Sequence, residues 1–161
     1  MPAPIPSAPV DAPRPVLCLE DLREGVLLRR YKRFLADVRL DDGSEVTVHC
    51  PNTGPMTGVL HPGGRVRLRH APSPSRKLAW TWEQAETSGA DGRPIWVGIN
   101  TALPNRLVRA TIEAGCLEPW LGPVAAIRGE VPYGQGGRSR IDLLLTPAGG
   151  ADGQPPADPQ I

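Results

Sequence analysis

The first half of the chain alternates apolar and polar residues in short segments that are separated by turn residues. From residue 34 the apolar side chains recur at every second position, and residues 45–50 repeat the alternation after an Asp-Asp-Gly-Ser turn at 41–44. A third alternating segment covers 65–70, after the turn His-Pro-Gly-Gly at 61–64. Strands at this close spacing predict a small antiparallel barrel or sandwich over residues 23–79. The alternation assigns four residues to its buried face: Phe34, Ala36, Val38 and Leu40.

The pattern changes in the second half, where strands and a helix are mixed. Two strands are predicted over 78–86 and 95–100, around a Gly-Ala-Asp-Gly turn. An apolar stripe near helical period predicts a helix over 105–118, with Asn105 as its N-cap and a glycine at 115 as its stop. Two further strands, 125–131 and 140–145, flank a glycine-rich turn. We therefore expect a second, α/β domain over residues 80–146.

The two ends of the chain differ from this body in composition. Ten of the 20 prolines lie within residues 1–15 and 147–161, together with Ala, Gly and Asp and almost no large apolar residues. Such segments bury too little surface to offset the entropy of ordering, so we predict disordered tails over 1–22 and 147–161. The sequence has no apolar run of membrane-spanning length, no signal-peptide pattern and only three scattered cysteines, which predicts a cytoplasmic protein with reduced thiols.

Charge is concentrated in one segment. Residues 23–80 hold eleven basic and five acidic residues, a net +6, although the whole chain carries only +1. Four of the cations interleave with Tyr31 and Phe34, a pattern typical of strands that stack nucleic-acid bases and hold phosphates. A solvated strand face is the alternative. The predicted nucleic-acid-binding residues are Arg29, Arg30, Lys32, Arg33, Arg65 and Arg67, and Arg69 extends the same strand.

Two carboxylates near the end of the body are candidate metal ligands. Asp142 is the only polar residue in the run 141–145, which is otherwise apolar, and a buried carboxylate is costly unless it is paired or binds a metal. Glu130 lies on the neighbouring strand, so the two side chains are placed to share one divalent cation such as Mg²⁺. The alternatives are an exposed Asp142 paired with Arg140 or Arg138, and a Glu130 that is surface charge.

Several blocks of residues, in order and spacing, resemble the sugar fermentation stimulation protein A family from about residue 23 to 146. They are Arg-Tyr-Lys-Arg-Phe-Leu-Ala-Asp-Val at 30–38, His-Cys-Pro-Asn-Thr-Gly-Pro-Met-Thr-Gly at 49–58, Thr-Trp-Glu at 81–83, Asn-Thr at 100–101 with Asn-Arg-Leu at 105–107, Glu-Val-Pro-Tyr-Gly at 130–134 and Arg-Ser-Arg-Ile-Asp at 138–142. These blocks make Asn52, Asn105, Glu130 and Arg140 candidate accessory residues of the site.

The resemblance implies an N-terminal OB-fold-like barrel that binds DNA, followed by a restriction-endonuclease-like (PD-(D/E)XK) domain with a Mg²⁺-dependent nuclease site. It also implies a connection to the regulation of sugar metabolism genes. Asp142 matches the first metal-binding aspartate of the family and is the predicted catalytic residue.

The chain departs from the family pattern after Asp142, because neither Glu nor Lys follows it, whereas the family carries a Glu-Val-Lys strand there. We therefore expect a truncated chain with an incomplete nuclease-like domain, whose main activity is DNA binding by the barrel. The alternatives are a nuclease completed by a second chain, and an interaction subunit that associates with a partner, or with itself, through an open sheet.

Overall fold

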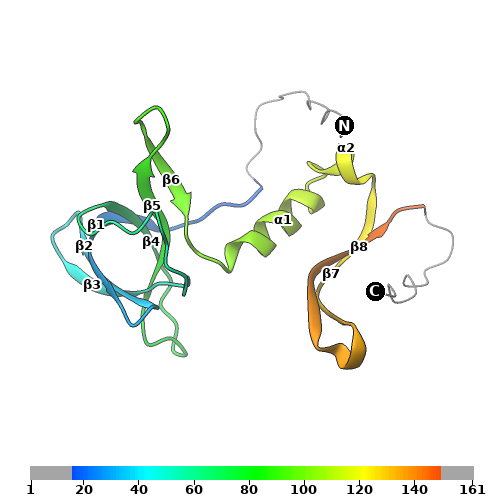
Figure 1. Cartoon of the computed structure of the whole chain (residues 1–161), viewed down its shortest axis with the longest axis horizontal. Helices are drawn as coiled ribbons and strands as arrows, with labels where there is room; N and C mark the ends of the chain where they lie inside the picture. The colour runs from blue at the N-terminus through cyan, green and yellow to red at the C-terminus, as the bar shows by residue number, and fades with distance from the viewer. Residues whose placement is uncertain (1–15, 150–161) are drawn as a thin grey trace. The chain divides into compact units, whose positions relative to one another are not determined.

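The computed structural model describes residues 16–149, so the disorder predicted for 1–15 and 150–161 lies outside the described residues. Two compact units divide the chain, a barrel unit, Cys18–Leu103, and a C-terminal unit that begins at Pro104. Figure 1 labels their elements along the chain. No helix within 16–149 has the length and apolar character needed to cross a membrane. The first described strand begins at Leu22 and the last ends at Pro147, so each overlaps a predicted tail by one residue.

The barrel unit is one antiparallel sheet that closes on itself. Its strands are β1 (Leu22–Tyr31), β2 (Leu35–Leu40), β3 (Glu45–His49), β4 (Arg65–His70), β5 (Trp80–Ser88) and β6 (Pro94–Gly98). They pair in the order β3-β2-β1-β4-β5-β6, and a parallel pairing of His49 with Thr81 joins β3 to β5. The cycle β1-β2-β3-β5-β4-β1 is that of a five-stranded OB fold, with β6 added to the outside of β5. The predicted OB-like barrel is therefore confirmed.

Local sequence explains how the strands bend into a closed barrel. The predicted turn at 41–44 places Gly43 at φ 86°, where a glycine has no steric penalty, and its N–H bonds to the Leu40 carbonyl at 2.9 Å. Long β1 pairs with β2 on one side and with β4 on the other, so it must coil strongly. A Cβ on Gly25 would lie 2.6 Å from the Arg39 carbonyl oxygen, so only glycine permits this close crossing.

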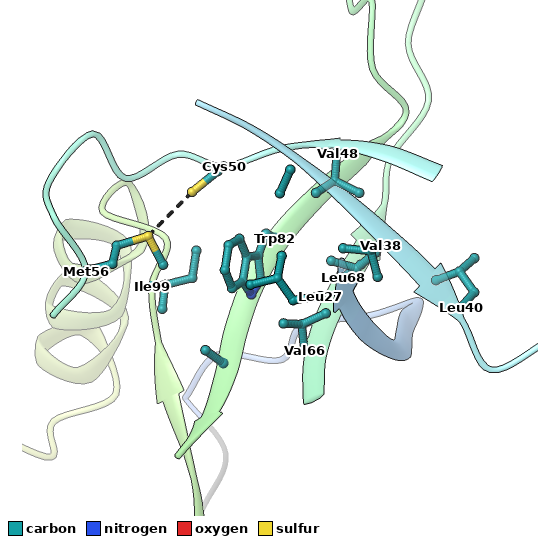
Figure 2. Close-up of a cluster of buried hydrophobic side chains, with 12 residues drawn as sticks. Leu27, Val38, Leu40, Val48, Cys50, Met56, Val66, Leu68, Trp82 and Ile99 are labelled. Atoms are coloured by element: carbon teal, nitrogen blue, oxygen red, sulfur yellow. Dashed lines mark hydrogen bonds between the residues drawn. The ribbon is translucent and has the colours of Figure 1, made fainter. Parts of the chain in front are cut away.

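Alternating residues of the five strands fill the barrel with apolar side chains. Figure 2 shows Trp82 in the middle of this core, with Leu27, Val66 and Ile99 around it. Trp82 is fully buried and its indole N–H donates to the Gln84 carbonyl at 2.8 Å, which satisfies its one polar atom. The Cys50 thiol is also fully buried and lies 3.7 Å from the Met56 sulfur. Burial of this cluster is the main source of stability in the unit.

The sheet continues beyond the predicted domain boundary at 79/80. β5 pairs with β4 and β3, and β6 pairs with β5, so residues 80–103 belong to the barrel unit. The strands themselves were predicted, but their partners are the strands before them, because Trp82 and Ala85 complete the barrel core. The boundary between the two units lies at 103/104 instead.

The C-terminal unit contains one longer helix, one short helix and a β-hairpin. Helix α1 covers Leu103–Glu113, with Pro104 in its first turn, so Asn105 lies inside the helix and is not its N-cap. A separate short helix, α2 (Glu118–Leu121), follows Gly115, which has φ 73°. Strands β7 (Val124–Tyr133) and β8 (Ser139–Pro147) pair around the single turn η1 (Gln135–Gly137). None of the described side chains of this unit is buried, so the restriction-endonuclease-like fold expected here stays a proposal.

Candidate nucleic-acid interface

Arg29, on the outer face of β1, is held by an acidic neighbour. Its guanidinium donates to Asp37 on β2 at 2.7 Å and lies 4.9 Å from the centre of the Tyr31 ring. Partial burial raises the pKa of the Asp37 carboxyl, but hydrogen bonds from Arg29, Thr47 and Tyr31 together outweigh it and hold that pKa below its ordinary value. The charge of Arg29 is thus largely matched by Asp37.

Arg30 supports the turn between β1 and β2. Its guanidinium donates to the Arg33 carbonyl at 3.0 and 2.5 Å and to the Asn52 carbonyl at 2.6 Å. It therefore connects the turn to the loop that follows β3. Arg30 was predicted to contact nucleic acid; in the structure its guanidinium binds the backbone of its own chain.

The turn presents its own cations and an aromatic ring to solvent. Lys32 and Arg33 have φ values of 49° and 63°, in the left-handed region that residues other than glycine rarely occupy. Both are exposed, and neither forms an ion pair with any described residue. Phe34 was predicted on the buried face of β2, but it lies in the turn and is 48 % exposed. The alternation begins only at Leu35, because the turn includes Phe34.

The loop between β4 and β5 adds two more cations that the sequence analysis did not select. Arg76, Lys77 and Leu78 line a hollow of about 270 Å³ together with His49, the last residue of β3. Arg76 also donates to the Thr81 hydroxyl at 2.6 Å, which ties the loop to β5. In OB folds the β1–β2 and β4–β5 loops border the ligand-binding face. The predicted OB fold could therefore have identified Arg76 and Lys77 as candidates.

The two loops approach the same strand end. Leu35 pairs with His49, and the Cys50 N–H donates to the Phe34 carbonyl at 2.8 Å, so the β1–β2 turn adjoins the end of β3 that lines the hollow. We call the residues gathered here the two-loop surface: Lys32, Arg33, Phe34, His49, Arg76 and Lys77. Adjacent strand residues face opposite sides, which is why Cys50 is buried while His49 reaches this surface.

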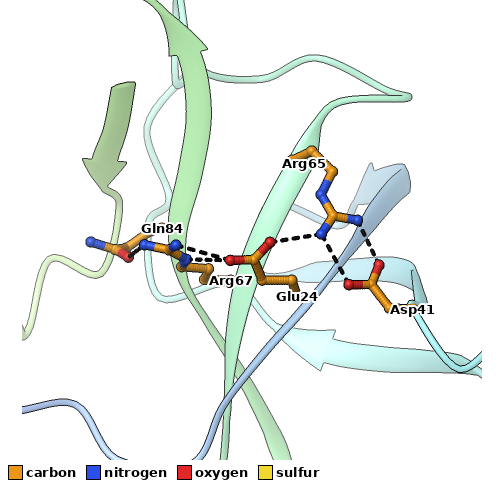
Figure 3. A network of polar contacts seen from close by, with 5 residues as sticks. All are labelled: Glu24, Asp41, Arg65, Arg67 and Gln84. Atoms are coloured by element: carbon orange, nitrogen blue, oxygen red, sulfur yellow. Dashed lines mark hydrogen bonds and ion pairs between the residues drawn. The ribbon is translucent and has the colours of Figure 1, made fainter. Parts of the chain in front are cut away.

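The other predicted cations lie on β4 and are neutralised. Figure 3 shows Arg65 between Glu24 and Asp41, at 2.7 and 2.5 Å, and Arg67 between Glu24 and Gln84. Hydrogen bonds from Arg65, and to a lesser extent from Arg67, hold the pKa of Glu24 below its ordinary value. The carboxylates of Asp41 and Glu24 in turn raise the pKa of Arg65. Arg67 also stacks 3.9 Å from the Trp96 ring centre. Both residues therefore stabilise the sheet and leave little uncompensated charge for phosphate.

A buried polar network supports the loop after β3. The Asn52 side chain accepts from the Gly54 N–H at 2.9 Å and donates to the Ile99 carbonyl at 3.2 Å, so this predicted accessory residue shapes the loop. Nearby on β5, Glu83 is fully buried; Arg69 donates to one of its oxygens at 2.9 Å and Asn100 to the other at 2.7 Å. Through these contacts the polar side chains of Arg69, Glu83 and Asn100 connect three segments of the barrel.

The candidate metal ligands lie on the β7–β8 hairpin. Its register sets positions 130 and 142 opposite one another, and Glu130 has φ 52°. Asp142 is exposed, and Glu130 lies 3.7 Å from Arg140. Among the described residues, no third His, Cys, Asp or Glu joins them in a cluster that could hold a metal. Two exposed carboxylates are fewer ligands than a nuclease metal centre requires.

Comparison with known proteins agrees with the barrel. A family model described as the SfsA N-terminal OB domain matches residues 28–99. The sugar fermentation stimulation protein homolog of Parasynechococcus marenigrum (strain WH8102) is 75 % identical over 132 residues, which are 82 % of this chain and 52 % of that protein. The homolog of Synechococcus sp. (strain CC9605) is 72 % identical over 142 residues, 88 % of this chain and 55 % of that protein. The chain thus spans about half the length of the curated relatives it matches.

A solved structure has the same fold. The structure of Pyrococcus furiosus SfsA in complex with Ca²⁺ aligns with a TM-score of 0.67 and 24 % identity, and covers 83 % of this chain and 52 % of that one. Because the family model covers residues 28–99 of the barrel unit, and the curated relatives match 82–88 % of the chain, the resemblance drawn from the sequence blocks is confirmed. The chain belongs to the sugar fermentation stimulation protein family.

Proposed function

We propose that the barrel unit binds DNA through the two-loop surface. The observation that carries the proposal is a contrast between two sets of cations. Arg29, Arg65 and Arg67 are matched by carboxylates, whereas Lys32, Arg33 and Lys77 have no ion pair among the described residues. Unmatched cations on the loops that border the ligand face of an OB fold are suited to the phosphates of a nucleic acid.

Charge reversal at the turn tests this proposal. We expect Arg33→Glu to weaken the binding of a fluorescein-labelled 20-mer DNA and to reduce the salt slope of log K by about 1, the effect of one lost phosphate contact. Fluorescence anisotropy at several salt concentrations measures both. Arg93→Glu is the control, because Arg93 is an exposed arginine just before β6 that lies 3.5 Å from Asp91 and is not a member of the two-loop surface. Equal loss in both variants, or binding that does not depend on salt, would contradict the assignment.

Arg30 calls for a different variant, because it holds the turn. Reversing Arg30 would remove its bonds to the Arg33 and Asn52 carbonyls and change binding indirectly. Arg30→Lys keeps the positive charge but loses the forked donor geometry that holds the turn. We expect this variant to weaken DNA binding, because the turn becomes less ordered, and to leave the salt slope of log K unchanged. A slope reduced by about 1 would show instead that Arg30 contacts a phosphate.

A second candidate function is metal-dependent cleavage of the bound DNA, the nuclease activity implied by the family, by a site that a second chain completes. Two observations favour it: the Pyrococcus furiosus protein binds Ca²⁺, and this chain sets Glu130 opposite Asp142 across the β7–β8 hairpin. Because no third His, Cys, Asp or Glu within residues 16–149 joins these two carboxylates, we expect weak Mg²⁺ binding and no plasmid cleavage by the 161-residue chain. Calorimetric titration with Mg²⁺ and with Ca²⁺, on the native chain and on Asp142→Ala, tests this. Mg²⁺-dependent cleavage that is lost in Asp142→Ala would establish a complete site.

The third proposal concerns a partner. The C-terminal unit leaves Leu107, Val108, Trp120 and Leu121 between 42 and 46 % exposed. Large exposed apolar side chains in one small unit favour association with a second chain or with another copy.

A further inference from the structure

The ring of Phe34 has no role in the barrel, and its position is unusual. It is the only phenylalanine in the chain, and it is 48 % exposed at the tip of a turn instead of buried in the core. Exposing a large apolar ring forgoes the burial energy that the same residue would contribute inside the barrel. Its exposure therefore calls for an explanation other than stability.

The turn that carries Phe34 is strained and yet tightly held. Two consecutive non-glycine residues, Lys32 and Arg33, adopt φ near 50–60°, a conformation that costs about 1 kcal/mol or more for each residue. Three sets of hydrogen bonds retain it: Phe34 N–H to the Lys32 carbonyl, Cys50 N–H to the Phe34 carbonyl, and the Arg30 guanidinium to the Arg33 and Asn52 carbonyls. Strain that the surrounding structure maintains in this way is typical of functional loops.

The surroundings of the ring identify what it can bind. Lys32 and Arg33 precede it in the same turn, and His49, Arg76 and Lys77 border the hollow at the adjoining end of β3. An exposed aromatic ring next to two cations of the same turn combines a stacking face with phosphate partners, the arrangement by which OB folds bind single strands. In a duplex the faces of the bases are covered by their neighbours, so a ring at a turn tip finds a free base face only on an unpaired strand.

We propose that Phe34 is a stacking platform for an unpaired base, so that the two-loop surface takes single-stranded nucleic acid in preference to duplex. This inference rests on the nucleic-acid function proposed above and adds its substrate class. The cations hold the backbone of the strand, and the ring selects for unpaired bases. Arg30 acts as a positioning residue, because its bonds fix the carbonyl before the ring.

The test compares binding of dT15, U15 and a 15-base-pair duplex to the full chain and to its variants. We expect Phe34→Ala to lower affinity for the single strands by about 5- to 150-fold, the range of one stacked base, and to change duplex affinity less than twofold. Phe34→Tyr should restore single-strand binding, whereas Phe34→Leu, which is apolar without a π face, should behave like alanine. Ile95→Ala is the matched control, because Ile95 is equally exposed, at 45 %, on β6.

The outcomes separate this inference from the proposed function. If Phe34→Ala leaves single-strand binding intact while Arg33→Glu abolishes it, the surface binds phosphate and the stacking role is wrong. If duplex binds as tightly as dT15, the preference is wrong. If no probe binds, both proposals fail together. A photo-crosslink between Phe34 and 5-iododeoxyuridine in an otherwise dT strand gives a readout that a merely structural residue would not produce, and the dT15 and U15 arms distinguish DNA from RNA.

Discussion

The two units use similar strands but differ in closure. In the barrel unit the parallel contact between β3 and β5 completes the sheet, and alternate side chains of β1 to β5 are buried. The β7–β8 hairpin has equally apolar strands, with Ile141, Leu143 and Leu145 on one face, yet none of them is buried. Apolar alternation therefore produces a core only where the strands enclose it, and an isolated two-stranded hairpin is marginal in water.

The largest expected difference between the units is in amide exchange. We expect amides of residues 26–70 to be protected at least about 100-fold more than those of residues 125–145, because opening a core strand requires global unfolding whereas the hairpin opens locally. Hydrogen-exchange mass spectrometry measures both segments in one sample. Sedimentation of the same sample reports self-association. Equal protection in a monomeric sample would show that the C-terminal unit is stable by itself; equal protection only in a dimer would support the proposed association.

Core truncation should sharpen the same contrast. Trp82→Ala is expected to lower the free energy of unfolding of the barrel by about 3–5 kcal/mol, since it removes the largest fully buried side chain. Leu143→Ala in the hairpin, where the side chain is only half-buried, should cost less than about 1 kcal/mol. Urea denaturation followed by circular dichroism checks both. Similar losses in the two variants would mean that a partner or a second copy covers the hairpin.

Much of this contrast was predicted from local sequence, and the rest depends on partners that sequence alone does not reveal. The alternation from residue 34, at 45–50 and at 65–70 predicted three strands and the turn at Gly43, because strand and turn preferences are local; the structure has these strands at 35–40, 45–49 and 65–70. The domain boundary was misplaced because β5 pairs with β4 and β3, and pairing between distant segments leaves no local signal.

Pairing between distant segments also explains why some residues of the candidate site were predicted wrongly or missed. Arg65 and Arg67 have the same local pattern as free cations, and only the pairing of β1 with β4 places Glu24 between them. Arg76 and Lys77 were not selected, because their loop acquires its role from the position of His49 at the end of β3. Phe34 was assigned to the core because alternation does not show where a turn ends.

A buried ion pair offers an intermediate effect within the barrel. Arg69→Met would leave the Glu83 carboxylate, which is fully buried, with Asn100 as its remaining side-chain partner. We expect a loss of about 2–3 kcal/mol, below the 3–5 kcal/mol of fully enclosed pairs, because the Arg69 side chain is 30 % exposed and water can replace it in part. The control is Glu83→Gln, which keeps an acceptor for Arg69 and should cost less. The reverse order in thermal melts would contradict the importance of the charge.

The smallest expected effect is a loss of stability of the barrel unit at acidic pH. Hydrogen bonds from arginines and hydroxyls hold the pKa values of Glu24, Asp37 and Asp41 below their ordinary 4.5 and 3.8, and all three lie in the barrel unit. A depressed carboxyl pKa stabilises the folded state above about pH 4, and this stabilisation is lost as the pH falls through the folded-state value. These groups are largely exposed, so solvent screening keeps the change modest.

Urea midpoints at pH 7 and pH 3 measure this dependence. Asp37→Asn and Arg29→Met should both reduce the acid sensitivity, since each removes the same interaction. If both variants lose as much stability between pH 7 and pH 3 as the native chain does, the Arg29–Asp37 pair makes no contribution to the acid sensitivity.

The pairing of His49 with Thr81, which closes the barrel, also bears on the order of events during synthesis. Strands β1 to β3 can pair as soon as they leave the ribosome, since their partners are adjacent in the chain. Their apolar faces stay open until β4 and β5 have emerged, because closure joins segments that are far apart, and such contacts form slowly. A nascent chain therefore carries an uncovered apolar sheet face through the translation of the loops at 50–64 and 71–79, and chaperone capture is expected in that interval.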